Sequence, residues 1–150
     1  MPSSPTKSQQ VVERLNPLIG TWRMEIARPG EPAGVFHGKV AYELMPGGHF
    51  LVQRWEVDDA ASPDGVALIG FDPDRDAFVQ HCYDSHGATL VYEMSVGDGN
   101  LQIWRITAGF SERFTGVFRD RGNVIRGGWE KSDDGVTWEP EFDLICTKVR

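Results

Sequence analysis

Three titratable side chains, His81, Asp84 and His86, form the most compact group of this kind in the sequence. Imidazole and carboxylate groups at such short spacing can bind a metal ion such as zinc. On one strand, however, His81 and His86 would point to opposite faces, and Ser85-His86-Gly87 is typical of a turn. We therefore predict no metal site.

Acid–base catalysis is a second hypothesis for these residues. Histidine titrates near neutral pH, so His81 facing an internal pocket could act as a general base, with Tyr83 on the same face. Glu130 is the other catalytic candidate, provided that it faces inward. The sequence contains no Gly-x-Ser-x-Gly motif, and we expect Cys82 and Cys146 to be reduced, buried and unreactive. The alternative is that His81 is a polar residue without a role.

Aromatic side chains with polar tips are the candidates for ligand binding. Such side chains are buried favourably only when their OH or NH group finds a partner, which favours a wet or ligand-filled interior. A dry core that these rings simply fill remains the alternative. Arg54, if it faced inward, would need a carboxylate partner, either Glu130 or an anionic ligand. The predicted ligand-binding residues are Tyr42, Arg54, Trp55, Tyr83, Tyr92, Trp104 and Trp129.

The positions of these residues depend on regularly spaced turns. Clusters rich in Gly, Pro, Asp and Asn, such as Pro46-Gly47-Gly48 and Gly97-Asp98-Gly99-Asn100, recur along the chain. These residue types favour tight hairpin turns, and the segments between them are rich in β-branched and aromatic residues, as strands are. We predict strands at roughly 20–28, 35–45, 49–58, 66–71, 77–84, 89–96, 101–107, 110–119, 124–131 and 136–148.

Short connections make neighbouring strands antiparallel, and closing the sheet removes its exposed edges. The predicted fold is all-β: a closed up-and-down antiparallel barrel of about ten strands with one short N-terminal helix. Ser8 is the expected cap of this helix, which would run from Gln9 to about Leu15 and end near Pro17. Residues 1–7 would be a disordered leader, and residues 8–150 a single domain.

Side-chain alternation predicts which residues face the lumen. On the last strand Trp138, Phe142, Leu144 and Cys146 would face inward, with Glu139, Glu141, Asp143 and Thr147 outward. Phe110, Phe114 and Phe118 would face inward from the eighth strand, and Leu90, Tyr92 and Met94 from the sixth. The third, fifth and seventh strands are apolar on both faces, so their direction stays open. A partner subunit covering the outer face would explain this, which makes a homodimer one hypothesis.

Charge and composition restrict the partners. The net charge of −7 repels nucleic acid, and the basic residues do not cluster. No apolar run approaches the roughly 20 residues of a membrane-spanning helix, and the first ten residues do not have the pattern of a signal peptide. We therefore expect a cytoplasmic protein that binds neither nucleic acid nor membranes.

Gly20-Thr21-Trp22, after a short helix, resembles the Gly-x-Trp signature of lipocalins and their calycin relatives. In those barrels the Trp closes the floor beneath a basic side chain, which the resemblance assigns to Lys148 or Arg150. Longer stretches are similar to a family of bacterial lipocalin-like domains of unknown function: Gly47 to Val52, Ile69 to Pro73, Tyr83 to Gly87, Arg113 to Gly116 and Gly128 to Trp138. This resemblance implies the fold and no particular activity.

The segment from Leu15 to Trp22 is also distantly similar to nitrobindins, which are haem-binding barrels. Their haem-binding histidine lies towards the carboxyl end, whereas no histidine follows His86 here. Haem would have to use His37, His49, His81 or His86, and we expect no cofactor. Fatty-acid-binding barrels are a second distant likeness; they pair an Arg inside the barrel with the ligand carboxylate.

Three functions remain open at this point. The first is binding of a small apolar or amphipathic molecule in the barrel lumen. The second is an enzyme of the same shape, a cyclase, isomerase or hydrolase that uses a lumenal acid or base. The third is a ligand-free, dimeric structural module.

Overall fold

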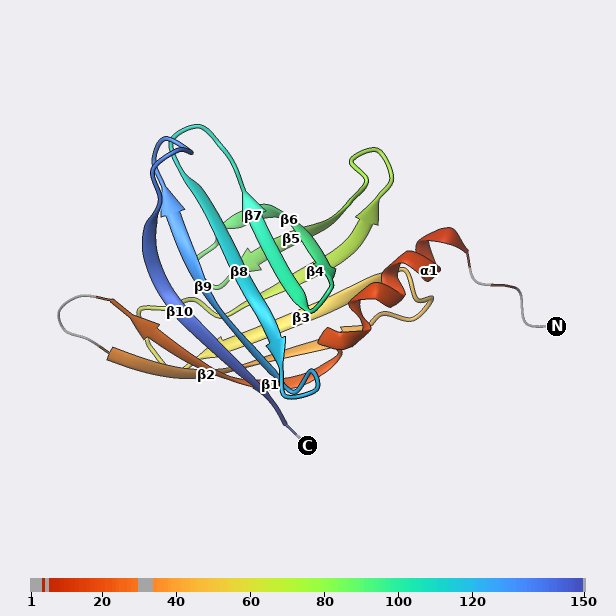
Figure 1. Ribbon diagram of the computed structural model, residues 1–150, viewed down its shortest axis with the longest axis horizontal. Coiled ribbons are helices and arrows are strands. Elements are labelled where there is room, and N and C mark those ends of the chain that lie inside the picture. The colour runs from red at the N-terminus through yellow and green to blue at the C-terminus, as the bar shows by residue number, and fades with distance from the viewer. Residues whose placement is uncertain (1–3, 5, 30–33, 150) are drawn as a thin grey trace.

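The computed structural model describes residues 4, 6–29 and 34–149. It contains a short α-helix, a 3-10 helix and ten strands that close into one antiparallel barrel (Figure 1). The strands are β1 (Gly20–Arg28), β2 (Gly34–Leu44), β3 (Phe50–Val57), β4 (Gly65–Asp72), β5 (Ala77–Asp84), β6 (Thr89–Gly97), β7 (Asn100–Arg105), β8 (Ser111–Arg119), β9 (Val124–Ser132) and β10 (Glu139–Lys148). The predicted fold class is confirmed.

Each strand pairs with its neighbours in the chain, and β1 also pairs with β10. Trp22 on β1 is the register partner of both Val40 on β2 and Lys148 on β10, so the chain closes on itself at this point. The hairpin turns follow the predicted chemistry. Between β6 and β7, for example, Asp98 and Gly99 both have positive φ values, of 54° and 76°, as a two-residue type I′ turn requires.

The helix begins earlier than the sequence predicts. Thr6, not Ser8, caps α1 (Lys7–Val12): its hydroxyl accepts a hydrogen bond from the Gln9 backbone, and the Gln9 side chain accepts one from the Thr6 backbone. The Ser8 hydroxyl instead contacts His49 Nδ1 at 2.5 Å. Lys7 therefore belongs to the helix, while residues 1–3 and 5 of the expected leader lie outside the described residues.

The helical segment closes one end of the barrel. After α1 the chain continues as a 3-10 helix, Glu13–Leu18, which accommodates Pro17. The four apolar residues of this segment that are buried are Val11, Val12, Leu15 and Leu18. Trp22 is fully buried next to them, donates to the Leu18 carbonyl at 2.8 Å, and lies 5.3 Å from Lys148 Nζ. The expected Trp–cation contact is thus confirmed for Lys148, and Arg150 lies outside the described residues.

The last strand departs from simple alternation. Pro140 pairs with Glu130, and Phe142 pairs with Trp129, so Glu141 is an extra residue that forms a β-bulge. Phe142, Leu144 and Cys146 face inward as predicted, but Trp138 precedes the strand and packs on the outside beneath Arg113. The prediction for Trp138 and Glu141 is wrong, because the bulge reverses the alternation between them.

Two predicted strand ends are also wrong. Phe110 precedes β8 and is 40% exposed. Residues 133–138 form a turn, because the Asp134 carboxylate accepts hydrogen bonds from the backbone N–H groups of Val136 and Thr137 at 2.8 and 2.7 Å. Such local bonds replace ladder hydrogen bonds, so β10 starts only at Glu139. They also lower the pKa of Asp134 to about 2.

None of the described helices is long and apolar enough to cross a membrane.

Candidate functional site

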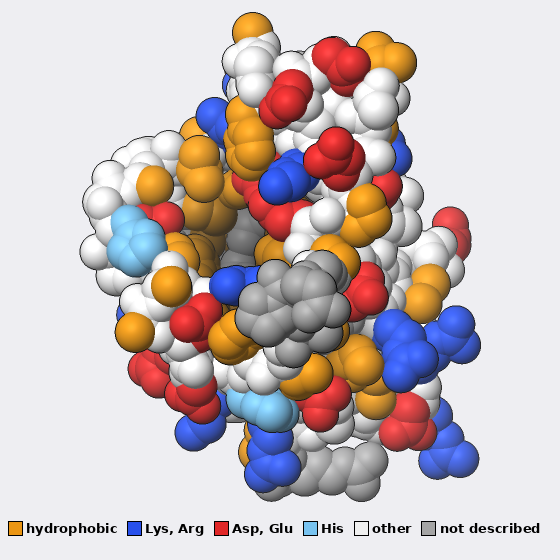
Figure 2. All heavy atoms as spheres, turned by 90° about the vertical axis from the view of Figure 1, so that its left-hand side faces the viewer, with side chains coloured by type: hydrophobic (Ala, Val, Ile, Leu, Met, Phe, Trp, Pro, Cys, Tyr) orange, Lys and Arg blue, Asp and Glu red, His pale blue; other side chains and the backbone are white. Residues whose placement is uncertain are grey.

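The barrel encloses a lumen of about 470 Å³ that opens at the end opposite α1. The loops β3–β4 and β5–β6 lie at this end, and their residues Ser62, Pro63 and Ala88 belong to the lining. Figure 2 faces this end and shows a hollow walled by apolar side chains, with charged side chains on its rim. The volume falls within the range of roughly 300–1,000 Å³ that is usual for small-molecule sites.

Aromatic rings form one wall of the lumen. Trp129 lies between three of them: its ring centroid is 5.8 Å from that of Tyr92, 5.5 Å from that of Phe114 and 6.2 Å from that of Phe142. These rings come from β6, β8, β9 and β10. They meet because each lies on the inward face of its strand. Such a wall favours an apolar or flat ligand.

A few polar groups interrupt this apolar lining. Gln80 is buried and donates a short hydrogen bond to Gln53 across the lumen wall. Tyr42 is 8% exposed, and within the described part of the chain no group hydrogen-bonds its hydroxyl. Burial raises the pKa of Tyr42 well above its usual value, so it remains a neutral phenol. Trp55 is satisfied locally, because its indole N–H donates to the Pro63 carbonyl at 3.2 Å.

Two carboxyl groups, from Glu112 on β8 and Glu141 on β10, face each other near the open end. The Tyr92 hydroxyl donates to Glu112 Oε1 at 2.8 Å. Burial, the charge of Glu112 and a hydrogen bond with it raise the pKa of Glu141 to about 7, while Lys131 and Arg28 oppose this rise. Glu141 Oε1 is buried and has no hydrogen-bond partner among the described residues. At neutral pH Glu141 is therefore partly protonated.

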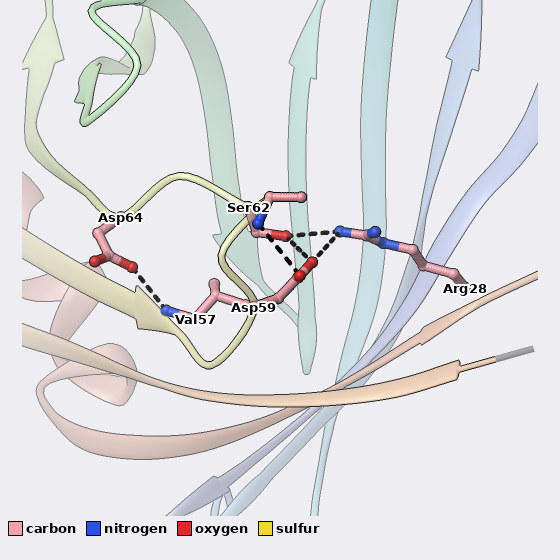
Figure 3. A network of polar contacts seen from close by, with 6 residues as sticks. Arg28, Val57, Asp59, Ser62 and Asp64 are labelled. Carbon is pink, nitrogen blue, oxygen red and sulfur yellow. Dashed lines mark hydrogen bonds and ion pairs between the residues drawn. The ribbon is translucent and has the colours of Figure 1, made fainter.

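Arg28 is the one basic side chain of the described lining, and it is already paired (Figure 3). Its guanidinium donates to the Ser62 hydroxyl at 2.7 Å and to Asp59 Oδ2 at 3.2 Å, and it packs 4.5 Å from the centroid of the Phe36 ring. The Ser62 hydroxyl donates to Asp59 as well, and these hydrogen bonds lower the pKa of Asp59. This cluster ties β1 to the β3–β4 loop at the rim.

The two cysteines also line the lumen. Cys82 and Cys146 are free and buried, and burial raises the pKa of each thiol to about 12. Both therefore remain protonated at neutral pH and offer no thiolate nucleophile. This confirms their predicted role as small buried apolar side chains.

The structure separates the residues that the sequence grouped as site candidates. Tyr42, Trp55, Tyr92 and Trp129 line the lumen. The remaining five candidates do not line the lumen, and on β3, β5 and β7 this decides the direction that the sequence left open: Arg54, His81, Tyr83, Trp104 and Glu130. Successive side chains of a strand point to opposite faces, and on β3, β5 and β7 the inward positions are taken by the adjacent residues Trp55, Cys82 and Ile103.

Four of the candidates outside the lumen form contacts on the outer surface of the barrel. Glu130 pairs with Arg113 at 2.9 Å, and the Trp104 indole donates to Glu93 at 2.7 Å. His81, Tyr83 and Trp104 line a broad groove on the outer face of β3 to β7. Large apolar side chains in this groove are exposed to solvent, namely Phe50, Leu68, Val91 and Ile106 together with Tyr83.

Sequence reasoning did not single out four polar residues of the lumen. Three of them, Gln53, Gln80 and Glu112, alternate with apolar residues on inward faces, and this alternation was the available signal. The fourth, Glu141, gave no such signal, because its inward position depends on the bulge.

The histidines do not fit the haem site that the nitrobindin likeness implies. His37, His81 and His86 are exposed, His49 lies beside Ser8, and none of the four lines the lumen. Within the described residues, no group of three or more His, Cys, Asp or Glu side chains is arranged to hold a metal ion. His81 and His86 lie on β5 and in the turn after it, as the sequence indicated.

Comparisons with known proteins agree with this fold. Residues 7–103 match the family described as a protein of unknown function, DUF1579. No curated protein matches the chain. The chain is similar to the crystal structure of Rv2717c from M. tuberculosis, with a TM-score of 0.64 and 13% sequence identity over 98% of this chain and 100% of that chain. At this identity the similarity shows the fold alone.

Proposed function

Because the chain belongs to the DUF1579 family, whose function is unknown, we propose a function from its geometry: it binds a small, largely apolar or amphipathic molecule in the barrel lumen. One observation carries the proposal, namely a lumen of about 470 Å³ with aromatic and aliphatic walls. Protein cores are normally packed without voids larger than a water molecule, so space of this size and lining suits a ligand.

The polar groups of the lumen support an amphipathic ligand over a purely apolar one. They are few, and they lie at separate places: Gln53 and Gln80 in the wall, and Glu112 and Glu141 near the opening. A small number of fixed polar groups on an apolar surface is how binding sites orient their ligands. Access is through the end opposite α1.

The test combines ligand identification with a variant that fills the lumen. Native mass spectrometry of the purified protein, before and after denaturation, should show a small molecule that is released. A shift of the Trp fluorescence emission should then report binding of 1-octanol, since Trp55 and Trp129 line the lumen. Leu90→Trp, which places a larger side chain in the lumen, should weaken binding at least tenfold, whereas Thr115→Trp on the outer face of β8 should not. Equal binding by both variants would contradict the proposal.

Acid–base catalysis in the same lumen is the second candidate function. It is supported by Glu141, whose pKa of about 7 lets it donate or accept a proton at neutral pH. His81 and Glu130 lie outside the lumen and do not support this function. Loss of turnover of the identified ligand in Glu141→Gln, with retained binding, would favour it. The lumen itself argues against a ligand-free module.

We also propose that the barrel is of the lipocalin, or calycin, type. Support comes from Gly20-Thr21-Trp22 at the start of β1, with Trp22 on the barrel floor and the ammonium of Lys148 over its ring. Among the barrels that share this arrangement, an internal ligand is common, which agrees with the proposed function.

The outer groove of β3 to β7 supports a homodimer. Its exposed apolar side chains form one continuous surface of the kind that marks interaction sites. Two copies that each carry a net charge of −7 repel one another. The charged residues lining this groove, Asp72, Arg75, Glu93 and Arg105, are balanced, so a second copy can dock there without local repulsion.

A further inference from the structure

The opening of the lumen carries more carboxylates than basic groups. The charged side chains of the described lining are Arg28, Asp84, Glu112 and Glu141. Arg28 is bound to Asp59 and Ser62, so its charge is already compensated by a residue outside the lining. Asp84 is likewise engaged, because its Oδ1 accepts the backbone N–H groups of His86 and Ala88 at 2.9 and 3.0 Å. The two glutamates are left as the uncompensated groups.

No ion pair within 4.0 Å links Glu112 or Glu141 to a basic side chain of the described residues. The nearest basic residues are Arg105 and Lys131, the register partners of Glu112 on β7 and β9, neither of them in an ion pair with it. Lys131 and Arg28 favour the ionised form of Glu141, and Arg105 lies close enough to affect Tyr92. Tyr92 provides one neutral hydrogen bond, to Glu112. Glu141 Oε1 is buried without a partner. A buried carboxylate oxygen in this state is costly, and a cationic donor would satisfy it.

A second polar group, independent of the carboxyl pair, also points to a lumen ligand. Tyr42 is 8% exposed and lines the lumen on the side of α1, where no described group hydrogen-bonds its hydroxyl. Unlike Glu141 Oε1, its oxygen is not among the enclosed atoms without a partner, so it is open to the lumen and can bond a ligand there. The aromatic wall of Phe114 and Trp129 lines the same lumen as both polar groups. A ligand with an apolar body therefore has a polar contact available at either end.

We propose that the lumen binds an amphipathic amine, with its ammonium group between the Glu112 and Glu141 carboxylates and its apolar body against Phe114 and Trp129. This inference rests on the proposed function, since it names the ligand class of the same lumen. Binding the ammonium displaces the proton of Glu141, so binding releases a proton and strengthens as the pH rises through the titration of Glu141. An anionic ligand is disfavoured by the same carboxylates.

Three probes with the same eight-carbon chain separate the inference from the proposed function: octylamine, 1-octanol and octanoate. At pH 8.5 we expect octylammonium to bind at least tenfold more tightly than octanol, and octanoate to bind least. At pH 6 the preference for the amine should shrink, because the pair holds a proton there. Calorimetry in buffers of different ionisation enthalpy should show proton release with octylamine and none with octanol.

Glu141→Gln should reduce the affinity for octylammonium about tenfold at pH 8.5 and that for octanol much less, so that the preference for the amine is lost. Glu130→Gln is the matched control, because Glu130 lies on the adjacent strand but outside the lumen, and it should change neither affinity. If octanol binds and the amine is not preferred, or if Glu141→Gln keeps the preference, the inference is wrong and the proposed function stands. If none of the probes binds, the proposed function itself fails.

Discussion

Trp129 on β9 and Phe142 on β10 are register partners, with ring centroids 6.2 Å apart. The next pair towards the open end is Glu130 with Pro140, so the backbone of Glu141 has no partner on β9. Phe142 faces inward by alternation with Leu144 and Cys146, and the extra residue brings the Glu141 carboxyl inward beside it, close to Glu112. The bulge thus adds the charged part of the candidate site to its apolar wall.

The raised pKa of Glu141 predicts a stability that falls as the pH rises. In the folded protein its pKa is about 7, against 4.5 for the unfolded chain. Between these values the folded state binds a proton that the unfolded state lacks, so stability decreases from about pH 4.5 to 7 and this group contributes no further change above that. Glu141→Gln should remove this decrease. Denaturant unfolding of both proteins at pH 5 and pH 8 measures it, and an equal pH dependence in the two would contradict the assignment.

The Gln53–Gln80 contact predicts non-additive stability effects. Gln80→Leu alone leaves the Gln53 amide without its partner in the lumen wall and should destabilise the fold by about 1–3 kcal/mol. Gln53→Leu combined with Gln80→Leu removes both amides and should restore most of that loss. Urea denaturation of the two single variants and the double variant gives the coupling, and additive effects would contradict it.

The Trp22–Lys148 contact predicts a measurable contribution to the closed end of the barrel. Lys148→Met keeps the length of the side chain but removes the ammonium that lies 5.3 Å from the Trp22 ring. We expect a loss of about 0.5–2 kcal/mol in unfolding free energy. The same substitution in a Trp22→Leu background should cost much less, since the ring is gone. Equal costs in both backgrounds would show that the contact contributes nothing.

The outer groove predicts self-association that one charge can abolish. Ile106 is 61% exposed in the groove, so Ile106→Glu should disrupt a dimer without disturbing the barrel core. Val136→Glu is the control, because Val136 is 82% exposed but lies in the β9–β10 turn, outside the groove. Sedimentation velocity should show a dimer for the wild type and for Val136→Glu, and a monomer for Ile106→Glu. A monomeric wild type would exclude this use of the groove.

The turn pattern predicts much of the fold, because its signals are local. Hairpins such as the one at Asp98 and Gly99 need positive φ values that few residue types tolerate, and antiparallel order follows from short connections. The inward direction of side chains was predicted correctly where one face of a strand is polar, as for Phe114 on β8. On β5 both faces are apolar, so the sequence left the direction open, and in the structure His81 lies on the outside.

The sequence by itself determined the closed ten-stranded barrel, its short N-terminal helix and the Trp22 floor, because turn chemistry, alternation and a short motif act over a few residues. Tertiary structure alone decided which polar groups meet in the lumen. Glu112 and Glu141 come from β8 and β10, which are separated by β9, and their meeting depends on the pairing of these three strands and on one bulge. A bulge shifts the side chains on one side of it by one position relative to the partner strand, and no residue type near Glu141 indicates that shift.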